Sequence, residues 1–422
     1  MKKMTLTTKI LLSLILGALF GVLLSHLESD FIKHTLMLDG ILKLIGTGFL
    51  NAIKLLVVPL IFVSIVYATA SLDDIKKIGR IGSKTFLYYI TTTAIAIVVA
   101  LTVANIIKPG IGIDLSMITS GEGVSEVASI SFIDTLLQII PTNIFEAFST
   151  NNVLGVLFFA VLMGLSITLV GEKAQPVLVL FDGLNEVFLK LVTLIMQFAP
   201  FGVFALVANT FATFGFSAML PLFKYALSIL VALAIQFFIV YLSMLLFIGK
   251  LSPKIFVKKF TPIFNFCFST ASSSAALPLG LESSDKQFGV SKKVSSFTLP
   301  LGATINMDGT AIMQGVAVVF IAQIYGIQLG LGEYMMVILT AVLASIGTAG
   351  VPGVGLVMLT MVLSAINLPI EGIALIMGID RILDMIRTGI NVAGDHVCTL
   401  LIAKQENEFD ETVYNRPMVD LD

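Results

Sequence analysis

The sequence predicts an all-α polytopic membrane protein, with eight transmembrane helices and two re-entrant helical hairpins that form an inverted repeat. Three observations lead to this fold class: a strongly apolar composition, long apolar runs that recur along the chain, and two polar interruptions towards the C-terminus. Of the 422 residues, 57% are hydrophobic and 12% are charged, and the mean hydropathy is +1.01. Because the runs are long and unbroken rather than short and alternating, they indicate helices and not barrel strands.

The apolar runs have about the length needed to cross a bilayer core of roughly 30 Å. They cover residues 10–27, 41–70, 85–107, 153–170, 176–207, 222–248, 310–325 and 372–403. No polar stretch between them reaches the length of a soluble domain. The first run follows Lys2, Lys3 and Lys9 without a small-residue cleavage pattern, so we expect a retained first helix rather than a signal peptide. Pro59 and Pro200 predict kinks.

The distribution of basic residues predicts the orientation in the membrane. Lysines and arginines cluster after the second and sixth runs and again before the seventh, at positions 76–84, 250–259 and 286–293. The loop after the first run is acidic instead. Because positive loops remain in the cytoplasm, we expect a multi-pass protein of the cell membrane with both termini inside. Residues 405–422 are expected to be a short, frayed terminus.

Two stretches rich in Ser, Thr and Gly, residues 268–278 and 345–355, interrupt apolar arms of roughly 10–15 residues. Such arms are too short to span the membrane, so each stretch predicts the tip of a hairpin that enters and leaves on one side. Lys258 and Lys292 place the ends of the first hairpin in the cytoplasm, and Glu333 and Glu371 place those of the second outside.

Each hairpin is followed by a helix that carries polar residues at membrane depth, which predicts an inverted repeat with binding sites near the bilayer midplane. The alternative is that the small residues only allow close helix packing. Packing does not account for the polar and ionisable residues beside each tip, which are Asn306 and Asp308 after the first hairpin and the polar residues between Asp384 and Asp395 after the second.

The last apolar run carries a polar stripe on one helical face, spread over roughly 80°. Its members are Asp380, Asp384, Arg387, Asn391 and Asp395. The planar fork of Arg387 suits a carboxylate and Asp384 suits an ammonium group, so the pair matches an acidic amino acid. The alternative is an internal Asp384–Arg387 ion pair. Arg381 is expected only to neutralise Asp380.

The segment from Gly302 to Thr310 predicts a cation site beside the substrate. Its glycines favour local unwinding, and free carbonyls with Asn306 and Asp308 offer the hard oxygen atoms that alkali cations need. Asn391 and Asp395 are expected to join them. The alternative is that Asp308 is a protonated structural carboxyl group. A cation next to the substrate couples the two by linkage, and backbone N–H groups at Ser272–Ser274 are candidates for the α-carboxylate.

Other function classes find little support. The sequence lacks Gly-x-Gly-Asp, Gly-x-Ser-x-Gly and Walker-type motifs, and His396 is the only deep histidine, so we expect neither an enzyme nor an ATP-driven pump. A channel needs a continuous polar pore, whereas two hairpins favour alternating access. Cys267 and Cys398 are expected to be buried, inert thiols.

With these motifs in order and at matching spacing, essentially the whole chain resembles the dicarboxylate/amino acid:cation symporter family, the glutamate transporter homologues. The residues that carry the resemblance are Ser272-Ser-Ser274, Asn306-Met-Asp-Gly-Thr310, Ser345-Ile-Gly-Thr-Ala-Gly-Val-Pro-Gly353 and Asp384-Met-Ile-Arg-Thr-Gly-Ile-Asn391-Val-Ala-Gly-Asp395.

The resemblance implies the glutamate-transporter fold, a homotrimer and an elevator mechanism of alternating access. Residues 1–70 and 129–215 would form the scaffold that trimerises, while residues 71–128 (helix 3 and an extracellular loop) and 216–422 (helix 6, hairpin 1, helix 7, hairpin 2 and helix 8) would form the moving transport domain. The implied function is sodium-coupled uptake of L-aspartate or L-glutamate, with no organic cofactor and no nucleic-acid partner. The alternative is proton- or sodium-coupled C4-dicarboxylate symport.

The resemblance also implies the site residues. Substrate contacts would come from Ala271, Ser272, Ser273, Thr310, Val351, Gly355, Asp384, Arg387 and Asn391. One sodium site would use Gly302, Asn306, Asn391 and Asp395, a second Thr304, Ser345, Ile346 and Thr348, and a third Tyr89, Thr92, Thr93, Asn306 and Asp308. The chain departs from the family pattern at Ala271, where some relatives carry Arg, and at Thr93, where Ser is familiar.

Overall fold

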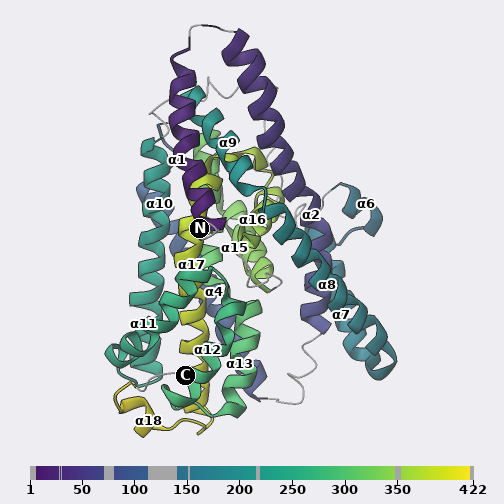
Figure 1. Ribbon diagram of the computed structural model, residues 1–422. Helices are drawn as coiled ribbons and strands as arrows, with labels where there is room; N and C mark the ends of the chain where they lie inside the picture. The colour runs from purple at the N-terminus through teal and green to yellow at the C-terminus, as the bar shows by residue number, and fades with distance from the viewer. Residues whose placement is uncertain are drawn as a thin grey trace, which may run out of the picture.

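The computed structural model describes residues 6–27, 29, 31–70, 80–112, 140–150, 153–214, 219–346 and 353–418. Within these ranges the chain is helical, and the only β pairing is an isolated bridge between Val290 and Phe409. Helix α1 (Leu6–Ser25) lies at the front of the bundle, and α18 (Glu411–Asn415) lies at its lower end (Figure 1). The predicted all-helical class is confirmed for the described residues.

The first half of the chain supplies long helices that pack mainly on one another. They are α1 (Leu6–Ser25), η1 (Phe31–Leu42), α2 (Lys43–Ala70), α4 (Arg80–Ile107), α6 (Ile144–Ser149), α7 (Val153–Val170), η3 (Gly171–Ala174), α8 (Gln175–Met196) and α9 (Ala199–Phe214). Helix α1 lies along α9, and α2 contacts α7, α8 and α9. Helix α4 is the exception, because it packs on α14 of the second half.

The run 176–207 is not one kinked helix, as the sequence analysis expected, but two helices. The break falls at Gln197–Phe198, and Pro200 lies in the first turn of α9. A proline is tolerated there because the first N–H groups of a helix have no intrahelical partner. Pro59, by contrast, lies inside α2.

The second half contains both predicted interruptions. Its helices are α10 (Met219–Ala234), η5 (Ile235–Tyr241), η6 (Met244–Ile248), α11 (Pro253–Thr270), α12 (Ser273–Lys286), α13 (Lys292–Ile305), α14 (Asp308–Ile324), α15 (Leu331–Ile346), α16 (Val354–Ala365), η7 (Ile370–Gly372), α17 (Ile373–Gln405) and α18 (Glu411–Asn415). The first interruption separates α11 from α12, and the second falls between α15 and α16. Between α13 and α14 the helix is broken at Asn306 and Met307.

Helices α14 and α17 form the centre of the molecule. Nearly every residue of α14 is buried, and it contacts α4, α10, α15, α16 and α17. Helix α17 in turn contacts α11, α12 and α13. The broken helix and the polar stripe therefore face each other inside the fold rather than facing lipid.

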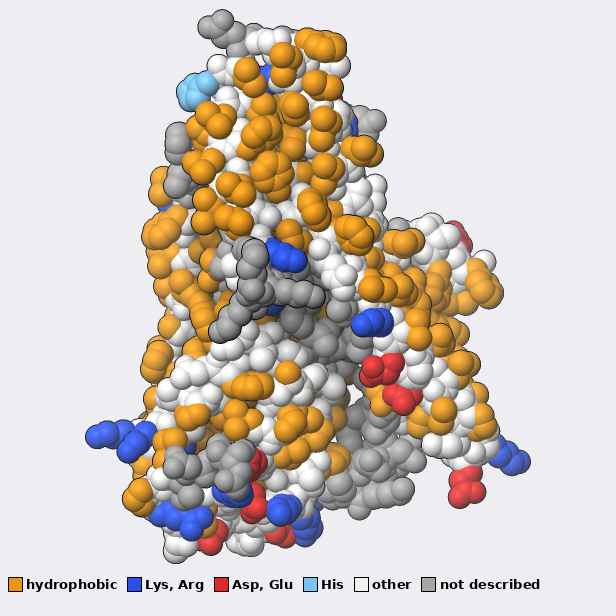
Figure 2. All heavy atoms as spheres, in the orientation of Figure 1, with side chains coloured by type: hydrophobic (Ala, Val, Ile, Leu, Met, Phe, Trp, Pro, Cys, Tyr) orange, Lys and Arg blue, Asp and Glu red, His pale blue; other side chains and the backbone are white. Residues whose placement is uncertain are grey.

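Five helical stretches in the described residues, some of them made of consecutive helices, are long and apolar enough to cross a membrane: Thr8–Ser25, Arg80–Ile107, Phe158–Phe188, Leu220–Ile248 and Lys292–Ile324. Helix α17 has the length, at 33 residues, but carries the charged stripe. Hydrophobic side chains cover much of the visible face, and charged ones gather towards the lower end (Figure 2). This distribution is that of a helical membrane protein.

The C-terminus is not frayed, which corrects the expectation for residues 405–418 within the described part. Residues 406–416, here named the C-terminal clasp, pack against residues 287–291, which connect the first hairpin to α13. Lys259 Nζ donates to the carbonyl oxygen atoms of Gln287, Val413 and Tyr414 at 2.7, 3.0 and 2.8 Å. The Tyr414 side chain is buried. A buried ammonium with three acceptors is well satisfied, so the clasp is an ordered part of the fold.

Ion pairs add to the clasp. Glu406 accepts from Lys84 at 2.6 Å and from Arg80 Nε at 3.0 Å, and these hydrogen bonds lower the pKa of the Glu406 carboxyl group. A carboxyl group whose pKa is lower in the folded than in the unfolded state stabilises the fold at pH values above the ordinary carboxyl pKa. That contribution is lost as the pH falls through the lowered value.

We expect Lys259→Met to release the clasp. The methionine cannot donate to three carbonyl groups, and the loss of about 2 kcal/mol corresponds to roughly thirtyfold faster amide hydrogen exchange in the clasp. Hydrogen exchange read by mass spectrometry measures this change at one pH. The matched control is Lys292→Met, because the Lys292 side chain is exposed. Equal protection of the clasp in both variants would contradict the assignment.

Candidate functional site

The polar stripe of α17 lies on one face, as predicted, and all five of its members are buried. The Arg387 side chain is only 1% exposed. Helix α17 delivers these side chains to the second hairpin at one end and to the break between α13 and α14 at the other. A guanidinium in such a position is stable only with acceptors around it.

Arg387 finds its acceptors on its own helix. Its Nη1 pairs with Asp380 Oδ1, and its Nη2 lies 3.3 Å from Asp380 Oδ2 and 3.0 Å from Asp384 Oδ1. The internal Asp384–Arg387 pair, an alternative left open by the sequence, is therefore present and extends to Asp380. Within the described residues, Arg387 Nε has no hydrogen-bond partner.

The expected pairing of Arg381 with Asp380 is corrected. Arg381 Nη1 lies 3.6 Å from Asp384 Oδ2, while Asp380 pairs with Arg387. The helical period explains this choice of partners, because Asp380 lies two turns before Arg387 and Arg381 lies one turn before Asp384. Asp384 consequently has an arginine on either side.

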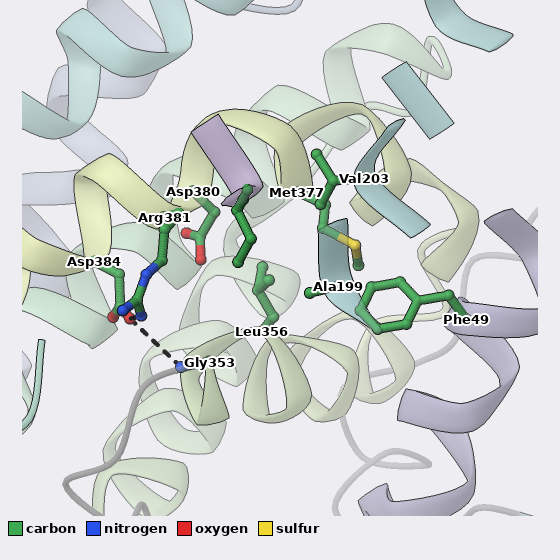
Figure 3. Close-up of a pocket in the computed structure, with 10 residues that line it drawn as sticks. Phe49, Ala199, Val203, Gly353, Leu356, Met377, Asp380, Arg381 and Asp384 are labelled. Carbon is green, nitrogen blue, oxygen red and sulfur yellow. Dashed lines mark hydrogen bonds and ion pairs between the residues drawn. The ribbon is translucent and has the colours of Figure 1, made fainter. Parts of the chain in front are cut away.

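The second hairpin closes over Asp384 through a glycine. Gly353, with φ of +85°, directs its N–H to Asp384 Oδ2 at 3.4 Å. Figure 3 shows this contact beside Asp380 and Arg381, with Phe49, Ala199 and Val203 forming the opposite wall of the same pocket. The pocket therefore lies between α16 and α17 on one side and helices of the first half on the other.

Gly355 explains a second close approach. A Cβ at this position would lie 3.1 Å from Thr310 Cγ2 and 3.6 Å from Arg387 Nη2. Glycine thus allows α16 to approach Thr310 closely, and Gly355, Thr310 and Arg387, three of the predicted substrate residues, lie together. Val351 and Thr348 lie outside the described residues.

Asn391 connects the stripe to the broken helix. Its Oδ1 accepts from Gly309 N at 2.7 Å, and its Nδ2 lies 3.4 Å from Thr310 Oγ1. A Cβ on Gly309 would lie 2.6 Å from the Arg387 carbonyl oxygen, so the two backbones meet at this point. Thr310, Asn391, Arg387 and Asp384 consequently form one contiguous set.

The tip of the first hairpin has a specific backbone geometry. Ala271 is buried with φ of +50°, in the left-handed region that side chains seldom adopt. The Ser272 side chain caps α12 by accepting from Ala275 N at 3.2 Å. Ser273 is buried and lines a small cavity together with Asp395 and His396. This places Ser273 near the predicted cation residues.

Four residues of the first predicted sodium site converge. Asn306 Nδ2 donates to Asp395 Oδ1 at 2.8 Å and to the Asn391 carbonyl oxygen at 3.1 Å. A Cβ on Gly302 would lie 2.5 Å from Asp395 Oδ1, so only a glycine fits beside that carboxylate. The set supplies carboxylate, amide and carbonyl oxygen atoms in one buried place.

The third predicted site surrounds Asp308, which is fully buried. Its carboxylate accepts from Thr93 Oγ1 at 2.6 Å, from Tyr241 OH at 2.6 Å and from Gln236 Nε2 at 3.0 Å. Two hydroxyl groups and one amide group thus bond both oxygen atoms of the buried Asp308 side chain.

The other members of that site lie close by. Thr92 Oγ1 lies 3.4 Å from Asn306 Oδ1, and Tyr89 OH donates to the Thr298 carbonyl oxygen at 2.9 Å. Sequence analysis missed Gln236 and Tyr241. The available signal was a glutamine in the otherwise apolar run 222–248, where a buried amide needs partners.

Of the three predicted sodium sites, the second is the one whose described residues converge least. Thr304 Oγ1 donates to the Leu301 carbonyl oxygen at 2.9 Å, and Ser345 Oγ donates to that of Val342 at 2.7 Å. Both hydroxyl groups therefore bond within their own helices. Ile346 packs beside Ile305 and Tyr89.

Cys267 and Cys398 are buried, as predicted.

A membrane-embedded helical bundle with buried charges between two interrupted segments is the architecture of a secondary transporter. The sequence model of the sodium:dicarboxylate symporter family matches residues 6–405, and the chain belongs to this family. Family membership makes the chain a transporter and not an enzyme.

Several curated relatives match nearly end to end. The chain is 38% identical to a proton/sodium-glutamate symport protein of Bacillus caldotenax, covering 97% of each chain. It is 37% identical to the proton/glutamate-aspartate symporter of Escherichia coli (strain K12), covering 97% of this chain and 94% of the relative. It is also 34% identical to a C4-dicarboxylate transport protein of Bacillus subtilis (strain 168), covering 96% of this chain and 94% of the relative.

Proposed function

We propose that this protein takes up L-aspartate or L-glutamate together with sodium ions, as a secondary active symporter. The observation that carries the proposal is the buried Arg387 fork, with Asp384 beside it and the second hairpin in contact with both. A carboxylate side chain and an amino group are the two features that this pair recognises in one small molecule.

Substrate binding would proceed by exchange of partners. Asp380 would remain on Arg387 and keep the guanidinium oriented, while the substrate carboxylate would take the place of Asp384 on Nη2 and extend to Nε. Asp384 would then accept from the substrate ammonium group. The contact between Gly353 N and Asp384 supports this step, because it couples the position of the hairpin to the carboxylate that changes partner.

The remaining substrate contacts would come from both hairpins and the broken helix. Backbone groups of Ala271, Ser272, Val351 and Gly355 would line the substrate, and the first-turn N–H groups of α12 at Ser273 and of α16 at Gly355 would hold the α-carboxylate. Thr310 and Asn391, already within 3.4 Å of each other, would bind the rest of the polar atoms.

Sodium would bind in the two assembled oxygen clusters, around Asp395 and around Asp308. Asn306 belongs to both, since it bonds Asp395 and lies beside Thr92. A third ion would require Thr304, Ser345, Ile346 and Thr348 to turn towards one another. An ion gradient then drives uptake because ion and substrate stabilise the same closed state.

We infer eight transmembrane helices, two re-entrant hairpins and cytoplasmic termini in the plasma membrane. A scaffold of residues 1–70 and 129–215 would form a homotrimer, and a transport domain of residues 71–128 and 216–422 would move against it as an elevator. The packing supports this division, because α1 lies on α9 and α2 on α7 and α8, while α14 and α17 gather the site.

Uptake of radiolabelled aspartate, glutamate and succinate by purified protein in proteoliposomes tests the function. We expect both amino acids to accumulate under an inward sodium gradient. Equal uptake with potassium or choline outside, driven by a pH gradient, would establish proton coupling instead.

The second candidate function is C4-dicarboxylate symport, which the name of the Bacillus subtilis relative favours. Succinate has no amino group for Asp384 to hold, so we expect it to be transported less well than aspartate. Stronger uptake of succinate than of aspartate would select the second candidate.

A further inference from the structure

An open groove of about 310 Å³ lies between α10, η5, α11 and α17. It is here named the α10–α11 groove. Its lining comes from α10 and η5 (Leu230, Leu233, Ala234, Phe237, Phe238), α11 (Val257, Phe260, Thr261, Phe264) and α17 (Ile386, Ile390). Apart from the Thr261 hydroxyl, these side chains are apolar. Ligand pockets begin at about this size.

The groove lies at the depth of lipid acyl chains. Helix η6 ends at Ile248 and α11 begins at Pro253, so the two walls diverge from one short connection at the predicted cytoplasmic surface. At about 1.5 Å per residue, Val257 lies roughly 6 Å and Phe238 roughly 15 Å from that connection. Phe238 is 61% exposed. An apolar groove at this depth suits a hydrocarbon chain.

Positive charge marks the cytoplasmic end of the groove. Lys254 points within about 20° of Thr261 on α11, and Lys258 lies one turn further along. Lys250 is in the connection itself. All three lysines are exposed, and none pairs with a carboxylate among the described residues. Lys286, at the end of α12, and Lys292, at the start of α13, differ from these three lysines because each pairs with a carboxylate.

We propose that the α10–α11 groove binds an anionic phospholipid, with one acyl chain in the groove and the phosphate on Lys254 and Lys258. Lysine stems extend along apolar surface and place their ammonium groups at the headgroup level. Anionic headgroups are attracted to such clusters. A zwitterionic headgroup brings its own cation to the same place and gains less from the lysines.

The absence of tryptophan from the sequence allows a direct test. Phe238→Trp places a single fluorophore in the groove, in purified full-length protein reconstituted into phosphatidylcholine vesicles. Brominated phosphatidylglycerol and brominated phosphatidylcholine quench it in proportion to their occupancy. We expect phosphatidylglycerol to bind preferentially, by about fivefold for each lysine that the phosphate contacts.

Matched variants distinguish a specific lipid-binding site from non-specific attraction of anionic lipids to a positive surface. In the Phe238→Trp background, Lys254→Gln/Lys258→Gln is expected to abolish the preference, while Lys286→Gln/Lys292→Gln removes the same charge and preserves it. Phe223→Trp, near the other end of α10 and 64% exposed, is expected to show no preference.

Three results would overturn the proposal. Equal quenching by the two lipids in the Phe238→Trp protein means an ordinary lipid-facing surface. A preference that survives in Lys254→Gln/Lys258→Gln means that the lysines do not hold the phosphate. If neither brominated lipid quenches the tryptophan of Phe238→Trp while both still quench that of Phe223→Trp, protein covers the groove.

Discussion

In Arg387→Ala, uptake of aspartate and glutamate is expected to fall at least about a hundredfold, because two charge-assisted hydrogen bonds to the substrate carboxylate are lost. Without the guanidinium, Asp384 still offers a place for an amino group, so we expect neutral amino acids to be admitted. Radiolabelled uptake of aspartate and of a neutral amino acid such as serine, under one sodium gradient, measures both changes.

The controls must separate substrate recognition from folding. Removing Arg387 takes the guanidinium partner from Asp380 and one of two arginines from Asp384, and an unpaired buried charge is destabilising. Asp380→Asn/Arg387→Ala removes one of these charges. It is expected to restore stability if misfolding caused the loss of uptake in Arg387→Ala. Arg416→Ala, at an exposed arginine, is the matched control. Undiminished aspartate uptake by Arg387→Ala would contradict the assignment.

The breaks in the helices could be predicted from sequence because their causes are local. Clustered Ser and Gly residues favour caps and turns over continuous helix, and the chain breaks at Ala271–Ser272 and again at Asn306–Met307. The buried face of α17 followed from helical periodicity alone. The number of spans and the trimer stay predictions, since neither follows from the described helices.

Features that depend on distant contacts were missed. Gln236 and Tyr241 bond to Asp308 across 72 and 67 residues of chain, and no periodicity encodes that meeting. The clasp is similar, because a short charged tail gives no sign that Lys259 will hold its carbonyl groups. Even the partner of Asp380 was mistaken, since Arg381 is adjacent in sequence whereas Arg387 is adjacent on the helical face.

We expect Asp308→Asn to weaken sodium binding by about thirtyfold or more, because it removes a buried negative charge from the oxygen cluster that would hold the ion. The asparagine retains the size of the side chain, and its NH₂ group can donate to the Thr93 hydroxyl while its carbonyl oxygen accepts from Gln236 and Tyr241. The expected loss is therefore electrostatic.

Thermal unfolding in rising sodium chloride, at constant total salt with choline chloride, measures this loss without requiring transport. A ligand that binds only the folded state raises stability by RT ln(1 + [L]/Kd), so a fit of stability against sodium concentration gives the dissociation constant. Asp182→Asn makes the same chemical change at an exposed position of α8 and is expected to leave the fitted dissociation constant unchanged. If Asp308→Asn responded to sodium like the parent protein, Asp308 would be a structural carboxyl group. The charge for the ion would then have to come from Asp395, the other carboxylate joined to Asn306.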